Sequence, residues 1–187
     1  MKYLIYTILL LPKWISIVVL FIYCILFAEF STIITQFMQI PASIELLFQI
    51  VIKVQYIIII LGCFATWLVI TFLFHLMAIL CDGKSDFKSY AMVAAFLYFI
   101  PAIVILVELF VLHFQLADLH IVNDPLLLVN NMHFKYAQKI IYGSFILYYL
   151  CIIVTTRYVY KLNWLCAIIC VLTPISVIGV VAEVMTL

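Results

Sequence analysis

Long uninterrupted runs of apolar residues constrain this chain more than any other feature of its sequence. A helix needs about 20 mostly apolar residues to cross the roughly 30 Å of bilayer hydrocarbon, and five such runs stand between charged or turn-forming residues. Of the 187 residues, 70% are hydrophobic and 9% are charged, whereas soluble domains have roughly 45–50% apolar and about 25% charged residues. The sequence therefore predicts an all-α, polytopic transmembrane helical bundle and excludes a soluble globular domain.

The five predicted spans form a single transmembrane domain over residues 1–187. They are expected at about 14–37, 56–80, 90–113, 137–156 and 163–185. In a five-span chain, one side of the membrane receives six of the nine basic residues, which are Lys2, Lys13, Lys84, Lys88, Arg157 and Lys161. Because Lys and Arg gather in cytoplasmic loops, we expect a cytoplasmic N-terminus and a C-terminus on the outer side.

Both longer connections are predicted to carry short interfacial helices on the outer side. In residues 42–55, Glu45, Gln49 and Lys53 recur every four residues and form one polar stripe on an otherwise apolar helix, which is typical of a helix in the headgroup plane. In residues 114–136, Asn123, Asp124 and Pro125 supply an N-cap and a proline suited to the first helical position.

Three carboxylates fall within or near the ends of the predicted spans, at Glu29, Glu108 and Glu183. At 1.5 Å per residue, each lies roughly 22–30 Å from the inner end of its helix, close to the outer rim. One interpretation is a proton-binding or cation-binding cluster between helices. The other, which we favour, is that they reach the headgroups or pair with Lys53, Lys135 or Lys139, because a carboxylate costs little at this depth.

A polar pair and two prolines lie deeper in the predicted bundle. His75 and Tyr98 lie about 10–12 Å from the inner face on spans joined by a short connection, which predicts an interhelical hydrogen bond; the alternative is that His75 bonds back toward Thr71. Pro101 and Pro174 lie near the middle of the bilayer. We expect both to kink their helices, either as a paired hinge or as simple shaping.

The sequence gives little indication of catalysis or of cofactor binding. Metal ligation is the weaker interpretation of the polar residues near the outer loop, which are His113, Asp118, His120, Asp124 and His133, since their spacing matches no metal motif. Gly83, Lys84 and Ser85 lack the preceding glycine and strand of a phosphate-binding loop, so no nucleotide is expected. The net charge of +1 and scattered basic residues exclude a nucleic-acid footprint. We expect no catalytic residues, no metal and no cofactor.

The stretch from Phe74 to Lys88, with its turn Asp82-Gly83-Lys84, continues to Tyr98-Phe99-Ile100-Pro101 and resembles the Yip domain family of five-span membrane proteins. In that family a histidine-containing helix end meets a Gly-Gly-like turn, a short polar link and a helix with a Tyr-x-x-Pro pattern. Asp82 stands where a first glycine is usual. The resemblance implies a non-enzymatic membrane scaffold, and the shorter prokaryotic relatives suggest an accessory subunit of a transport or envelope-stress system.

These observations together predict an integral membrane scaffold or accessory subunit that contacts another membrane protein laterally. The alternative is a small transporter or channel component that uses the outer carboxylates. Small residues at Ala91, Ala95 and Gly179 are candidate helix-packing positions. We expect the lipid bilayer and a second integral membrane protein as partners, in the inner membrane of a prokaryote or in a eukaryotic endomembrane.

Overall fold

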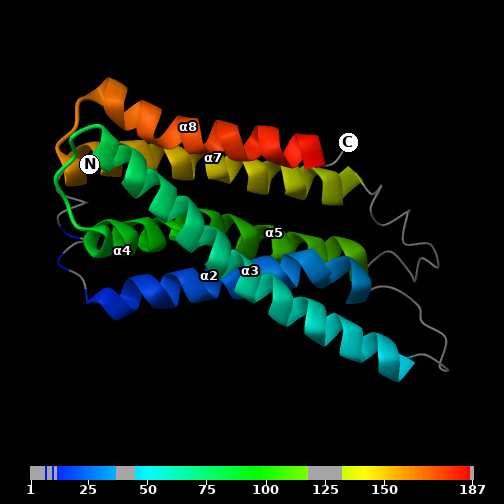
Figure 1. Cartoon of the computed structure of the whole chain (residues 1–187). Helices are drawn as coiled ribbons and strands as arrows, with labels where there is room; N and C mark the ends of the chain where they lie inside the picture. Colours follow the sequence, from blue (N-terminus) through cyan, green and yellow to red (C-terminus); the bar gives the residue numbers. More distant parts are fainter. Residues whose placement is uncertain (1–6, 8–9, 11, 37–44, 118–131, 186–187) are drawn as a thin grey trace. The chain divides into compact units, whose positions relative to one another are not determined.

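The described part of the chain is helical throughout. The computed structural model describes residues 7, 10, 12–36, 45–117 and 132–185, and these contain no strand. The helices, in chain order, are α2 (Lys13–Gln36), α3 (Glu45–Leu80), α4 (Phe87–Leu97), α5 (Phe99–Ala117), α7 (Met132–Tyr160) and α8 (Trp164–Met185) (Figure 1). The all-α prediction is therefore confirmed.

Four stretches among the described residues are long and apolar enough to cross a membrane. They are Lys13–Ile33, Glu45–Leu80, Phe87–Phe114 and Met132–Tyr160. The fifth predicted span corresponds to α8, in which the apolar stretch Trp164–Val180 is shorter. The helices thus indicate a membrane protein, while a count of five spans and the orientation remain predictions.

The predicted interfacial helix over residues 42–55 is not a separate element. Glu45 begins α3, and this helix continues without a break for 36 residues to Leu80. No proline lies between Glu45 and Leu80, and the glycine at Gly62 is tolerated within the helix, so nothing in the sequence stops the helix before the predicted second span. The second predicted interfacial helix falls mainly on residues 118–131, which lie outside the described residues.

Contacts divide the chain into two compact units whose segments interleave along the sequence. The first unit comprises residues 1–20, 65–98 and 147–187, and the second comprises residues 21–64 and 99–146. Helices α2, α3 and α7 each contribute residues to both units, so the units are not successive domains.

Each unit has its own buried core. In the first unit, Tyr90, Val93, Ala94 and Ala95 of α4 are fully buried, as is Ile152 of α7. In the second unit, the rings of Phe30 and Phe134 stack with their centroids 5.6 Å apart. Other buried core residues of that unit are Cys24, Ala28, Ile105, Leu112, Ala137 and Ile141. Ala91 and Ala95, predicted as packing positions for a partner, are used inside the first unit, whereas a Cβ added at Gly179 would meet open space.

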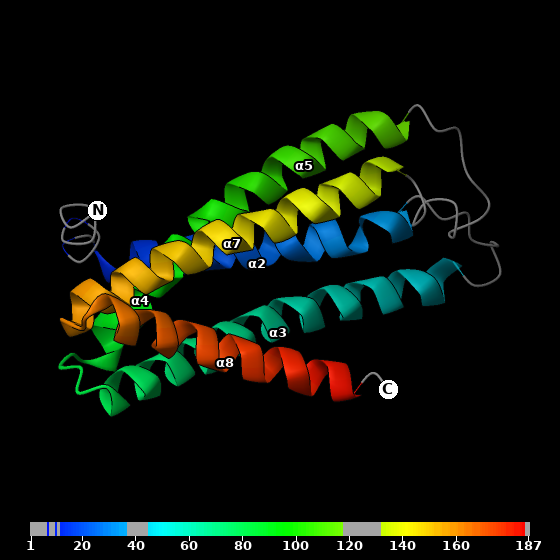
Figure 2. The same ribbon diagram turned by 90° about the horizontal axis from the view of Figure 1, so that it is seen from above.

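Polar residues at the helix ends explain where α4 and α8 begin. Asp86 has an extended backbone and its carboxylate accepts a hydrogen bond from the backbone N–H of Ser89 at 2.9 Å. Asn163 does the same for α8, accepting from the N–H of Cys166 at 2.7 Å. Both are N-caps that satisfy a donor otherwise left unpaired in the first turn. The chain reverses direction between α7 and α8 at the short turn that ends with Asn163 (Figure 2).

The two predicted kinks have different outcomes. Pro101 occupies the first turn of α5, and the helix is interrupted at Tyr98, three residues earlier. The proline ring excludes the carbonyl of Leu97, four residues back, from the helical hydrogen-bond pattern, which accounts for this break. Pro174 lies inside the continuous helix α8, where it removes the N–H donor that would otherwise bond the carbonyl of Cys170.

Candidate functional site

The first unit contains a buried polar cluster centred on His75 and Tyr160. His75 lies near the end of α3, and its Nδ1 is 2.5 Å from the phenol oxygen of Tyr160, the last residue of α7. Both side chains are buried, and the ring of Phe87 covers the imidazole with a centroid distance of 5.2 Å. The hydrogen bond joins residues 85 positions apart and ties α3 to α7 within this unit.

Tyr90 and Thr156 extend the cluster from α4 to α7. The Tyr90 and Thr156 hydroxyl oxygens are 3.0 Å apart, and the Thr156 hydroxyl donates to the carbonyl of Ile152 at 2.8 Å. Since a hydroxyl has one proton, Tyr90 must be the donor to Thr156. The ring of Tyr90 also meets the ring of Tyr160 edge-on at 5.1 Å. Each buried hydroxyl of the cluster therefore has a partner, as burial requires.

The turn that follows α3 lies next to the cluster and has a defined hydrogen-bond pattern. The N–H of Gly83 bonds the carbonyl of Ala78 at 2.9 Å, and the N–H of Asp82 bonds the carbonyl of Ile79 at 2.9 Å, which is a Schellman motif. Asp82 has a φ of 62°, the left-handed conformation that aspartate tolerates better than most residues. The turn Asp82-Gly83-Lys84 thus caps α3.

Gly83 is required in this turn because of close packing. A Cβ at this position would lie 2.6 Å from the carbonyl oxygen of Ala78 and 3.0 Å from the Cβ of Tyr160. The N–H of Lys84 approaches the carbonyl of Tyr160 at 3.5 Å. The turn is therefore built directly against the end of α7, beside the tyrosine that binds His75.

Two thiols meet next to this turn. The Sγ atoms of Cys81 and Cys170 are 3.6 Å apart, so the end of α3 contacts α8 within the first unit. All six cysteines are free thiols. Among the residues that the structure describes, no three His, Cys, Asp or Glu side chains gather in a way that could hold a metal ion.

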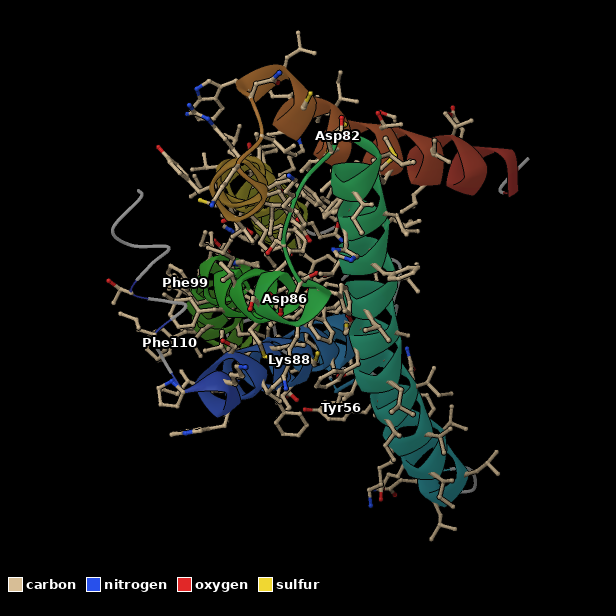
Figure 3. The ribbon with its side chains drawn as sticks, turned by 60° about the vertical axis from the view of Figure 1, so that its left-hand side comes forward. Tyr56, Asp82, Asp86, Lys88, Phe99 and Phe110 are labelled. Atoms are coloured by element: carbon tan, nitrogen blue, oxygen red, sulfur yellow. The ribbon has the colours of Figure 1, made fainter. Side chains whose placement is uncertain are left out.

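Asp86 at the start of α4 is one of several exposed polar residues of this region, with Asp82, Lys84 and Lys88. The Asp86 carboxylate is exposed and caps α4 (Figure 3). The hydrogen bond from the Ser89 N–H lowers the pKa of Asp86 below its ordinary value of 3.8, because the bond favours the ionised carboxylate. Asp86 therefore stabilises the beginning of α4, where the link from α3 ends.

The structure changes the predicted partner of His75. Tyr160 takes the place expected for Tyr98, whose ring instead lies 4.6 Å from the ring of Tyr148. Tyr98 is the residue at which the helix breaks, and Tyr160 is 62 positions further along the chain. The short connection between α3 and α4 correctly suggested that these helices are neighbours, but it carried no information about the end of α7.

The second unit contains an open pocket of about 330 Å³ between α2 and α3. Its lining comprises one acidic, one basic, two hydroxyl-bearing and two aliphatic residues, which are Glu29, Lys53, Thr32, Tyr56, Ile52 and Ile57. The Tyr56 hydroxyl donates to the carbonyl of Ile25 at 3.5 Å, and the Thr32 hydroxyl donates to the carbonyl of Ala28 at 2.9 Å. In Figure 3, Tyr56 projects from the side of α3 toward α2. One acidic and one basic side chain thus line the same pocket together with apolar surface.

The three candidate carboxylates have different surroundings. Glu29 is half-buried and lines the pocket, Glu108 is half-buried on α5 and is not part of the pocket lining, and Glu183 is exposed on α8. Glu29 and Glu108 belong to the second unit and Glu183 to the first. Glu29 and Lys53, one of the lysines named as a partner, line the same pocket, and the cluster of three carboxylates remains a prediction.

Comparison with known proteins assigns no family to this chain. No protein-family model, no curated protein and no solved structure matches the chain. The resemblance of residues 74–101 to Yip domains therefore rests on the quoted residues alone.

Proposed function

We propose that the chain is an integral membrane scaffold or accessory subunit whose helix α3 contacts another integral membrane protein. The single observation that supports this is the length and exposure of α3. Its 36 residues correspond to about 54 Å at 1.5 Å per residue, compared with roughly 30 Å of hydrocarbon and about 40–45 Å including the headgroups. Even at a tilt of about 40°, the helix still covers about 41 Å.

Apolar side chains are exposed along the whole length of α3, beside the polar stripe of Glu45, Gln49 and Lys53 near its beginning. At its beginning Leu46 is 76% exposed, and at its end Leu80 is 77% exposed. Only 17% of its most apolar segment is buried, compared with 33–39% for the other three candidate spans. Acyl chains cannot cover apolar residues that extend beyond the hydrocarbon, so another protein surface is needed for part of α3.

The middle of α3 carries a notch that fits a second helix. Gly62, Ala65 and Thr66 are exposed and lie at positions i, i+3 and i+4, so they share one face. A Cβ at Gly62 would meet nothing within 4 Å. Small residues at this spacing let two membrane helices approach closely, which is the main source of attraction between helices in lipid. We infer that a transmembrane helix of the partner occupies this notch.

Substitution at Gly62 tests the proposal. Gly62→Leu fills the notch without a clash inside the chain, so the protein should fold normally while the partner no longer co-purifies in mild detergent. Gly143→Leu is the matched control, because Gly143 is an exposed helical glycine of α7 with equally open space. A partner that is lost from both variants or from neither would contradict the proposal.

The pocket beside Glu29 favours a second function, a small transporter or channel component. Unlike a scaffold, a transporter or channel component requires ionisable side chains for its function. Replacing Glu29, Glu108 and Glu183 together by Gln should abolish proton-coupled or cation-coupled flux in a transporter. A scaffold with the same replacements should still co-purify with its partner.

A further inference from the structure

We propose that the pocket between α2 and α3 binds the headgroup of a lipid that carries a primary ammonium and a phosphodiester, as phosphatidylethanolamine does. The proposal goes beyond lateral contact with another protein and does not depend on it. It rests on the residues that line the pocket, on the depth of the pocket and on the apolar surface beside it.

The lining provides separate partners for the two charges of such a headgroup. Glu29 offers an anionic acceptor for the ammonium, and Lys53 offers cationic donors for the phosphodiester. The hydroxyl protons of Thr32 and Tyr56 are directed at backbone carbonyls, and a hydroxyl that donates its proton in this way still has lone pairs with which it can accept a hydrogen bond. A primary ammonium has three N–H donors and matches a lining with several acceptor oxygens, whereas a quaternary ammonium has none.

The pocket has the size and depth of a headgroup site. Its volume of about 330 Å³ lies in the range of small-molecule pockets, about 300–1,000 Å³. Glu29 follows Lys13 by 16 positions, which corresponds to about 24 Å along α2 and places it near the far boundary of a roughly 30 Å hydrocarbon layer. The long apolar stem of Lys53, which is exposed, lets its ammonium reach the phosphate level.

The apolar part of the ligand also has a surface to follow. Ile52 and Ile57 line the pocket itself. On the same helix, Val54 and Ile58 are exposed. Acyl chains attached to a headgroup in the pocket can therefore pack along α3, a contact that a small water-soluble zwitterion would lack.

Native mass spectrometry of the full chain in mild detergent tests the inference. The probes are phosphatidylethanolamine, phosphatidylcholine and phosphatidylglycerol with identical acyl chains, offered in equal amounts. We expect wild-type protein to retain phosphatidylethanolamine about tenfold more than phosphatidylcholine, since one charge-assisted hydrogen bond accounts for a factor of this size. Glu29→Gln should remove the difference between these two lipids. Equal retention by wild type, or an unchanged preference in Glu29→Gln, would overturn the inference.

Lys53→Gln supplies a second test at an exposed position where misfolding is not expected. It should weaken retention of all three lipids by about tenfold, because the phosphodiester is common to them, while the preference for phosphatidylethanolamine persists. Unchanged retention in Lys53→Gln would overturn the inference. Glu108→Gln and Lys139→Gln are controls in the same unit outside the pocket lining, and they should behave like wild type.

Competition with soluble phosphoethanolamine distinguishes a membrane lipid from a small soluble molecule with the same charged groups. Retained lipid that survives an equal concentration of phosphoethanolamine supports a lipid ligand held also by its acyl chains. Displacement under these conditions would overturn the lipid assignment and identify a soluble zwitterion as the ligand.

Discussion

Nδ1 of His75 and the phenol oxygen of Tyr160 are 2.5 Å apart and join α3 to the end of α7. Both residues are buried, so the bond has no competition from water and each partner depends on the other. Tyr160 also contacts Gly83 and the ring of Tyr90, which makes it the residue through which three helices of the first unit meet.

Removal of the Tyr160 hydroxyl should destabilise the first unit. Tyr160→Phe leaves the His75 nitrogen buried without its partner, and we expect a loss of about 1–3 kcal/mol in the free energy of unfolding. Equilibrium unfolding in mixed micelles measures the effect. Tyr158→Phe is the control, because this half-buried tyrosine on the same helix contacts Arg157 instead. Equal losses in both variants would contradict a specific role for the His75–Tyr160 bond.

A methyl group at Gly83 should be poorly tolerated. Gly83→Ala places its Cβ against the Ala78 carbonyl and the Tyr160 side chain, and overpacking of this kind costs about 1–3 kcal/mol. Gly143→Ala meets open space within a helix and should instead stabilise the protein by up to about 1 kcal/mol through helix propensity. Thermal unfolding in the same detergent compares the two. A stabilising Gly83→Ala would show that the turn is not packed as described.

The cap at Asp86 predicts a pH dependence with a definite sign. The folded pKa of Asp86 lies below its ordinary value of 3.8, so the unfolded state binds the proton more readily. The contribution of Asp86 to stability is therefore present above the ordinary pKa and is lost as the pH falls through the lower folded pKa.

Two substitutions at Asp86 test this dependence. Asp86→Ala should cost roughly 0.5–2 kcal/mol at neutral pH, a difference from wild type that shrinks in acid. Asp86→Asn keeps the cap but removes the titration, so its stability should lack this component of the pH dependence. The free energy of unfolding between neutral pH and pH 3 provides the comparison. A constant difference between wild type and Asp86→Ala would contradict the account.

The count of five spans predicts that the two ends of the chain lie on opposite sides of the membrane. The distribution of basic residues predicts a cytoplasmic N-terminus and a C-terminus on the outer side. Reporter fusions that are active on only one side of the membrane, placed at each end in turn, measure this directly. Two ends in the same compartment would exclude an odd number of spans and would contradict the prediction of five.

The apolar runs were sufficient to predict the helices, because length and composition decide whether a segment can cross lipid. The beginnings of α2 and α8 lie within one residue of their predicted positions. The prediction failed for residues 42–55, where the polar stripe of Glu45, Gln49 and Lys53 suggested a separate helix. A polar stripe describes one face of a helix and does not determine where the helix ends.

The site residues were harder to predict because contacts between distant segments leave no local pattern. His75 was recognised as a buried polar residue, but its partner Tyr160 is one of 12 tyrosines in the chain. The sequence singled out Glu29 as one of three carboxylates and Lys53 as one of three lysines that could pair with them. Tyr56 and Thr32 were missed, although Tyr56 lies close to one turn after Lys53 on the same helix.

Photo-crosslinking from Leu61 in native membranes tests the central proposal most directly. Leu61 adjoins the notch at Gly62 and is 63% exposed on α3, and Ile103, 55% exposed on α5, is the control position. The proposal predicts that Leu61 crosslinks to one other integral membrane protein, that Gly62→Leu abolishes this product, and that Ile103 gives lipid adducts. Lipid adducts alone from both positions would show that α3 faces only the bilayer and would contradict the proposal.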